Sequence, residues 1–332
     1  MDKYRIRTDL ATEAIKNTKL SEEEKTINGI ELKRVFVDEA NSESIGKKAG
    51  VYYTIDTRAI ETHDNDDIEN CENVLASVIK EVMEYEKIKS NAKGLIVGLG
   101  NINVTPDSLG PLVVDNVIVT RHMFMIDPTK VSPGITEVSA ISPGVMGATG
   151  IETFDIIEAV KSKIDIDYMI VVDALASRAI DRVNHTIQVT NTGISPGSGV
   201  GNRRKELSKE TMGIPVIAIG VPTVVDAVTI TSDTIDIIMK YMSHLQQNKS
   251  ENTIDLEKTQ RPNKEYREQL FGSVGSLTEE EKRELIDEIL TPTGFNMMVT
   301  PKEVDLDISD LTQIISKAID KALHPLVDKY EA

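Results

Sequence analysis

Two aspartates of the sequence, Asp107 and Asp173, follow apolar runs closely, and paired carboxyl groups can do acid–base chemistry. Asp107 comes after Leu95–Val97 and the tight turn Gly98–Asn101, and Asp173 comes directly after Tyr168–Val172. Two carboxyl groups in one desolvated pocket cannot both stay ionised, so the pair holds a base and an acid at neutral pH. Such a pair can activate a water for attack on an amide and protonate the leaving amine.

On spacing alone a structural role is the favoured explanation of the same aspartates, because an aspartate after a strand often caps a turn or a helix. Asp115 and Asp226 are open to the same two interpretations. The spacing of these residues favours the structural role and does not single out which of them would be catalytic.

The glycines Gly98 and Gly100 invite comparison with a nucleotide-binding loop. The dinucleotide fingerprint requires a third glycine three positions later, where this sequence has Asn103, and no phosphate-loop lysine follows. We therefore expect no nucleotide cofactor, and we expect these glycines to allow a tight turn and a close approach of neighbouring backbone.

Nucleophile and metal motifs give weaker signals. No Gly-x-Ser-x-Gly elbow occurs, Ser198 lies between glycines without a strand-to-helix context, and the single cysteine, Cys71, falls within a predicted helix. A Ser/His/Asp triad whose members lie far apart in the sequence is still an alternative.

The histidines form no pair at zinc-ligand spacing, so we expect no structural zinc, while a metal site with one histidine and two acids is still an alternative. The histidines are His63, His122, His185, His244 and His324.

Two glycine-rich loops, 142–150 and 194–202, could present backbone N–H groups to an oxyanion or to an extended peptide. The competing interpretation is that both loops are ordinary turns without a binding role. The second loop leads into the basic run Arg203–Lys205, which is either a solvated face or an anion contact. The loop glycines considered for substrate contact are Gly144, Gly147, Gly197 and Gly199.

Alternating strands and helices must position these groups. We predict a mostly parallel central sheet with helices on both faces, an α/β class, because the strands read as continuous apolar runs. Residues 1–28 are expected to be an exposed arm. The predicted strands are Ile30–Asp38, Val51–Asp56, Leu95–Gly98, Val138–Ile141, Tyr168–Val172, Val183–Thr190 and Pro215–Val221. The predicted helices are Ile68–Ser90, a helix beginning near Pro111, Ile151–Ser162, Ser232–His244, Leu277–Leu290 and Ile308–Leu326.

The composition limits the class of protein. The chain has 332 residues and a net charge of −17. Because nucleic acid is also negatively charged, we expect no direct nucleic-acid-binding face, although binding to a basic partner is still an alternative. One cysteine allows no intramolecular disulfide, and the sequence shows neither a signal peptide nor a membrane-spanning apolar run. We expect a soluble cytoplasmic protein without a membrane partner.

Several strings along nearly the whole chain resemble the germination protease family of spore-forming Firmicutes. The strings are IRTDLATEA, GLGNINVTPDSLGP, RHMF, SPGVMGATGIET, VDALASR, GISPGSGVGNRRKE, GIPVIAIGVPTVVDAVTITSDT and NMMVTPKEVD. The resemblance implies an atypical aspartic endopeptidase that degrades small acid-soluble spore proteins in the spore core during germination. It also implies a homotetramer, a zymogen without a cofactor, and a core like that of the hydrogenase-maturation endopeptidases.

The resemblance also assigns residues. The two essential aspartates of the family correspond to Asp107 in TPDSLGP and to Asp173 in VDALASR. Self-processing is suggested between Asp9 and Leu10, which makes residues 1–9 a propeptide and 10–332 one protease domain with a polar insertion near 244–270 and a helical C-terminal part. Two alternatives remain, a metal-assisted hydrolase using one of these aspartates and a non-catalytic binder of small spore proteins.

Overall fold

The structure is a computed structural model that describes residues 22–57, 61–195, 205–247, 263–290 and 297–325. Its contacts divide the chain into two compact units. The larger unit comprises Thr8–Ser177, Asp181–Val224 and Thr300–Ala332, and the smaller comprises Met1–Arg7, Arg178–Ile180 and Val225–Val299. The boundaries of the predicted propeptide and protease domain stay a prediction.

A mixed β-sheet forms the centre of the larger unit, with the order β1-β2-β3-β7-β8-β6-β4-β5 among the described residues. The pairs β6–β4 and β4–β5 are parallel, whereas the pairs from β1 to β8 along this order are antiparallel. The strands are β1 (Glu22–Ile27), β2 (Ile30–Val37), β3 (Gly50–Asp56), β4 (Gly94–Gly98), β5 (Val138–Ile141), β6 (Tyr168–Ser177), β7 (Thr186–Thr190) and β8 (Val216–Asp226).

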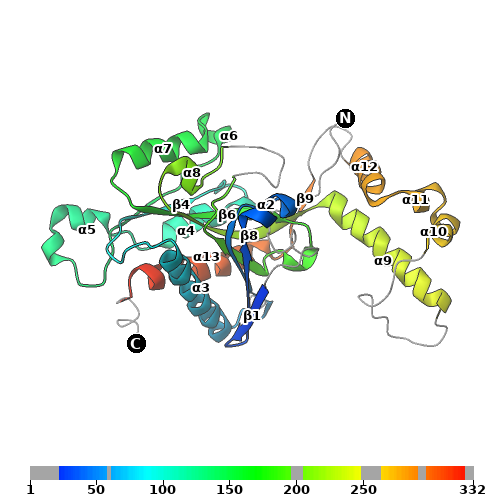
Figure 1. Ribbon diagram of the computed structural model, residues 1–332, viewed down its shortest axis with the longest axis horizontal. Helices are drawn as coiled ribbons and strands as arrows, with labels where there is room; N and C mark the ends of the chain where they lie inside the picture. Colours follow the sequence, from blue (N-terminus) through cyan, green and yellow to red (C-terminus); the bar gives the residue numbers. More distant parts are fainter. Residues whose placement is uncertain (1–21, 58–60, 196–204, 248–262, 291–296, 326–332) are drawn as a thin grey trace. The chain divides into compact units, whose positions relative to one another are not determined.

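Helices cover both faces of this sheet (Figure 1). Alternate side chains of β4 and β6 point to opposite faces, so Ile96 and Ile170 join the core under α3, α4 and α13, while Val97 and Met169 join the core under α7 and α8. The helices of the larger unit are α2 (Glu39–Ile45), α3 (Asn65–Tyr85), α4 (Leu109–Asn116), α5 (Arg121–Ile126), α6 (Met146–Thr149), α7 (Thr153–Lys163), α8 (Lys209–Met212) and α13 (Val304–Leu323).

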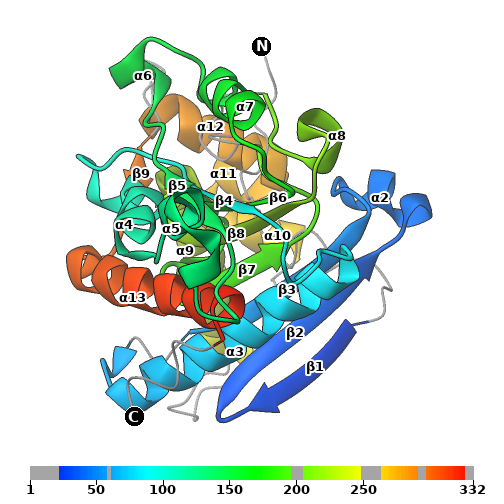
Figure 2. The same cartoon turned by 90° about the vertical axis from the view of Figure 1, so that its left-hand side faces the viewer.

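Helices α3 and α13 lie side by side against the sheet (Figure 2). Their buried faces supply much of the main core, and a buried ion pair joins them, in which Lys321 Nζ lies 3.0 Å from Glu72 Oε2. Cys71 is fully buried in this core, and it lies within a helix, α3, as predicted.

The smaller unit contains α9 (Ala227–Gln247), α10 (Lys264–Phe271), α11 (Ser273–Ser276), α12 (Glu279–Leu290) and the short strand β9 (Met298–Val299), which pairs antiparallel with the end of β8. The buried Lys282 of α12 pairs with Asp236 of α9 at 2.5 Å. This ion pair fixes α12 on α9. No helix in the described ranges is long and apolar enough to cross a membrane.

The structure confirms the α/β class and corrects several details. The β6-β4-β5 part of the sheet pairs in parallel, whereas β1, β2, β3, β7 and β8 pair antiparallel along the sheet, so the sheet is mixed rather than mostly parallel. The exposed arm expected for residues 1–28 includes β1, which a turn at Asn28 and Gly29, both with positive φ, joins to β2. Asn-Gly is a strong hairpin signal, and it was missed.

Candidate active site

The turn after β4 depends on its glycines. A Cβ atom on Gly98 would lie 2.1 Å from the carbonyl oxygen of Gly110, and a Cβ on Gly100 would lie 2.0 Å from that of Asp107. Gly100 also has φ +118°, which side chains rarely allow. The prediction that these glycines allow a close backbone approach is confirmed.

Asp107 ends the short 3-10 helix η2 (Thr105–Asp107), and hydrogen bonds fix its backbone on both sides. The Asp107 N–H donates to the Val104 carbonyl at 2.8 Å, and the Asn101 N–H donates to the Asp107 carbonyl at 3.0 Å. The Thr223 hydroxyl of β8 donates to the Pro106 carbonyl at 2.6 Å. Asp107 therefore sits on a loop that is fixed to both β4 and β8.

Asp173 lies within β6 and is only 5% exposed. The expected strand ends at Val172, but the observed strand continues to Ser177. Most side chains of this extension stay buried, although the neighbouring strand β4 already ends at Gly98. Gly98, the last residue of β4, pairs with Val172, and the Leu99 N–H donates to the Val172 carbonyl at 2.8 Å. Asp173 thus lies at the carboxyl edge of β4, in the middle of β6.

The structure brings the two predicted segments together, since η2 packs against β6. Each of Asp107 and Asp173 also interacts with further groups. The partly exposed Asp107 and the nearly buried Asp173 therefore occupy one edge of the sheet, where open α/β folds place ligands and catalytic groups.

The other two aspartates have structural positions. Asp115 is exposed on α4. Asp226 ends β8, and its Oδ1 accepts a hydrogen bond of 2.9 Å from the Val228 N–H at the start of α9. Asp226 therefore caps a helix, as the structural interpretation expects.

A small cavity of about 210 Å³ adjoins the Asp173 face of β6. Leu175, two residues further along the strand and hence on the same face, lines it together with residues of β7 and β8. Ser195 and Glu206 also line it, on either side of the segment 196–204. Gly197, Gly199 and the first two residues of the basic run lie outside the described residues.

The remaining loop glycines and Lys205, the described residue of the basic run, have ordinary environments. Gly144 has φ +73°, and Gly147 lies in α6 with open space where a Cβ would be, so substrate contact by either glycine stays a prediction. Lys205 pairs with Asp155 at 3.2 Å and lies over the ring of Phe154. This lysine acts as part of a solvated face in the described structure.

Three of the histidines, His63, His185 and His324, have different partners. His63 contacts Asp310 at 2.6 Å, and His185 contacts Glu61 at 3.3 Å. His324 is buried beside the Ile118 carbonyl, and burial lowers its pKa below the ordinary value. In the part of the chain that the structure describes, no three His, Cys, Asp or Glu side chains are grouped to hold a metal ion.

Comparison with known proteins decides the family. The sequence profile of the family described as germination protease matches residues 3–332. The germination protease of Bacillus cereus (strain G9842) is 48% identical over 353 residues, which cover 99% of this chain and 96% of that protein. That of Bacillus mycoides (strain KBAB4) is also 48% identical over the same shares. The chain belongs to the germination protease family.

As a member of this family, the chain is a protease of spore germination. A [NiFe] hydrogenase maturation protease, HycI from Thermococcus kodakarensis KOD1, is similar over 44% of this chain and 80% of that one, at 18% identity and a TM-score of 0.27. That score is too low to assign the core to the hydrogenase-maturation type, which stays a prediction.

Proposed function

We propose that the chain is an endopeptidase in which Asp107 and Asp173 together activate water against a peptide bond. The packing of η2 on β6 carries this proposal, because it places a partly exposed and a nearly buried carboxyl group at one edge of the sheet. Membership of a protease family supplies the reaction class.

The different exposure of the two carboxyl groups suggests their roles. Burial disfavours the charged form of a carboxyl group, so in this proposal Asp173 holds the proton and gives it to the leaving amine. Asp107, which solvent reaches, takes a proton from the attacking water. The cavity beside Leu175 offers space for substrate on the Asp173 face.

The biological context also belongs to this proposal. The substrates are small acid-soluble spore proteins in the spore core, which are basic or DNA-bound partners suited to a chain of net charge −17. The protease assembles as a homotetramer. It is made as a zymogen that cuts itself between Asp9 and Leu10, which lie outside the described residues.

Single substitutions test the aspartate pair. Asp107→Asn and Asp173→Asn should each lower cleavage of a peptide containing Thr-Glu-Ile-Ala by at least about a thousandfold and abolish self-processing, measured by mass spectrometry. Asp115→Asn is the matched control, because it removes the same group from an exposed position on α4, and it should keep full activity. Full activity of a folded Asp107→Asn or Asp173→Asn variant would rule out the pair.

Two other results would redirect the proposal. Loss of activity with a chelator and its return with a divalent metal would favour a metal-assisted hydrolase using one of these aspartates. Tight binding of small spore proteins without any cleavage by the purified protein would favour a non-catalytic binder.

A further inference from the structure

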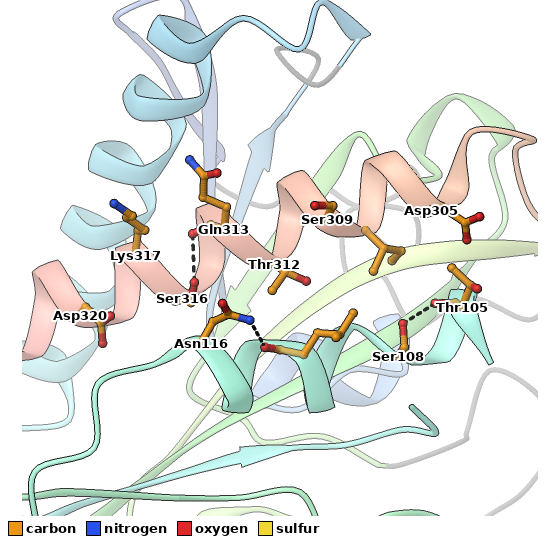
Figure 3. Close-up of a pocket in the computed structure, with 12 residues that line it drawn as sticks. Thr105, Ser108, Asn116, Asp305, Ser309, Thr312, Gln313, Ser316, Lys317 and Asp320 are labelled. Carbon is orange, nitrogen blue, oxygen red and sulfur yellow. Dashed lines mark hydrogen bonds between the residues drawn. The ribbon is translucent and has the colours of Figure 1, made fainter. Parts of the chain in front are cut away.

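A polar cavity of about 690 Å³ lies between α13 and the segment formed by η2 and α4, within the larger unit (Figure 3). Hydroxyl, amide and charged side chains line most of it, and its apolar lining comes from Leu112 and Ile308. Figure 3 shows Asp305 and Thr105 at one end of the cavity and Asp320 at the other. The end near Thr105 is two residues from Asp107 in the sequence.

The hydroxyl of Thr312 indicates that this cavity is a binding site. Thr312 lines the cavity from the middle of α13 and is only 6% exposed, yet its Oγ1 has no hydrogen-bond partner. Buried hydroxyl groups are nearly always hydrogen-bonded. Rotation of the Thr312 side chain toward the cavity would let a donor or an acceptor of a ligand complete the bonding of its hydroxyl.

The carboxylate of Asp305 indicates the charge of the ligand. Asp305 makes no hydrogen bond or ion pair with another described residue. At the opposite end, Asp320 already accepts a hydrogen bond of 2.9 Å from the Ile118 N–H, and Lys317 lies one turn before it. The available negative charge therefore lies at the Asp305 end, next to η2.

The dimensions of the cavity favour a polypeptide. Asp320 lies fifteen positions after Asp305 in the same helix, which corresponds to about 22 Å along the axis of α13. An extended peptide of about seven residues spans that length, and its backbone supplies the donors and acceptors that hydroxyl and amide groups require.

We propose that this cavity binds an extended basic segment of a polypeptide, with a lysine or arginine side chain on Asp305 and backbone groups on Thr312. It is a second contact for a polypeptide, separate from the aspartate pair, and only the identity of that polypeptide as substrate rests on the proposed function. Because Thr105 belongs to η2, an occupant of the cavity also holds the segment that carries Asp107.

Binding of a labelled peptide tests this site. The probe is a fluorescein-labelled peptide of about ten residues that contains lysine, glycine, alanine and serine and no acidic residue, and mass spectrometry checks that it stays intact. Fluorescence anisotropy should show saturable binding to the wild-type chain, weakened by salt. Asp305→Asn should weaken binding about fivefold, as expected for loss of an exposed ion pair.

The matched control is Glu303→Gln, which removes one negative charge two residues before Asp305, from a position that does not line the cavity. It should leave binding unchanged. Thr312→Val gives a second readout, because it should weaken peptide binding while raising the melting temperature of the free protein, since it removes a buried hydroxyl without a partner.

The proposal fails if the wild-type chain does not bind the basic peptide, or if Asp305→Asn and Glu303→Gln weaken binding equally. A probe in which glutamate replaces lysine should not bind, and equal binding of that probe would also contradict it. Anisotropy requires no cleavage, so failure of the two-aspartate proposal would leave this measurement unaffected.

Discussion

Thr223 and Pro106 lie 117 residues apart in the sequence, and a hydrogen bond of 2.6 Å joins them. The Thr223 hydroxyl of β8 donates to the Pro106 carbonyl, one residue before Asp107. A central strand of the sheet thereby fixes the loop that carries the proposed base. The position of that loop is set by tertiary contact as well as by its own turn.

Loss of the Thr223 hydroxyl should therefore lower activity more than stability. Thr223→Val keeps the shape of the side chain and removes the donor, so we expect cleavage to fall about ten- to a hundredfold, while the free energy of unfolding falls by about 1 kcal/mol. Thr223→Ser keeps the hydroxyl and should retain most activity. Unchanged peptide cleavage by the valine variant would show that this hydrogen bond does not position Asp107.

A side chain at Gly100 should disrupt the same loop. Gly100→Ala would place a Cβ atom 2.0 Å from the Asp107 carbonyl oxygen at a backbone conformation that favours glycine, so we expect a loss of at least about 2 kcal/mol in the free energy of unfolding. Gly147→Ala is the control, since its Cβ would meet no atom within 4 Å. Urea denaturation compares the two variants, and equal stability would contradict the observed packing.

Asp320 should make stability depend on pH. Burial raises the pKa of this carboxyl group to about 6, so the folded state binds its proton more tightly than the unfolded state. The stability it contributes is present below about pH 4 and is lost as the pH rises through about 6. Asp320→Asn keeps an acceptor for the Ile118 N–H, and its stability relative to wild type should improve between those pH values, measured by urea unfolding.

The control for Asp320 is a carboxyl group whose pKa is shifted in the opposite direction. Lys93 lies 2.7 Å from the exposed Asp165 and lowers the pKa of that carboxyl group. Asp165 therefore contributes stability above the unfolded pKa, and Asp165→Asn should lose stability relative to wild type as the pH rises. Parallel pH trends for the two variants would contradict the assignment.

Substitutions of Glu72 and Lys321, the ion pair between α3 and α13, should have non-additive effects on the free energy of unfolding. Lys321→Met leaves the buried Glu72 without its cation, at a cost of about 3 kcal/mol in the free energy of unfolding. Glu72 also accepts a hydrogen bond of 3.2 Å from Gln313, which does not replace the lost charge. The double variant Glu72→Met with Lys321→Met should recover most of the loss. A double variant as unstable as the sum of the two single variants would exclude coupling.

Continuous apolar runs predicted the middle of the sheet well. β5 has the predicted bounds Val138–Ile141, and the runs before Gly98 and Asp173 are buried strands. The bounds were wrong where tertiary pairing extends a strand through mixed residues, as in β6 to Ser177 and β8 to Asp226. Helix α5 was not predicted, because Arg121–Ile126 shows no helical spacing and leaves Met125 and Ile126 exposed.

The candidate site was predictable in outline only. Parallel-sheet geometry predicted that Asp107 and Asp173 would share an edge, and the packing of η2 on β6 agrees with that. The sequence could not predict the hydrogen bond from the Thr223 hydroxyl to the Pro106 carbonyl, nor the unpartnered hydroxyl of Thr312. Both depend on contacts between segments that are distant in sequence.

The buried cysteine makes the chain convenient for site-directed labelling. Cys71 is the single cysteine, and burial raises the pKa of its thiol to about 12, so the reactive thiolate is scarce at neutral pH. A cysteine introduced at an exposed position such as Ile102 would then carry a probe alone, without removal of Cys71. A fluorophore there would follow the loop before Asp107 during the proposed self-processing.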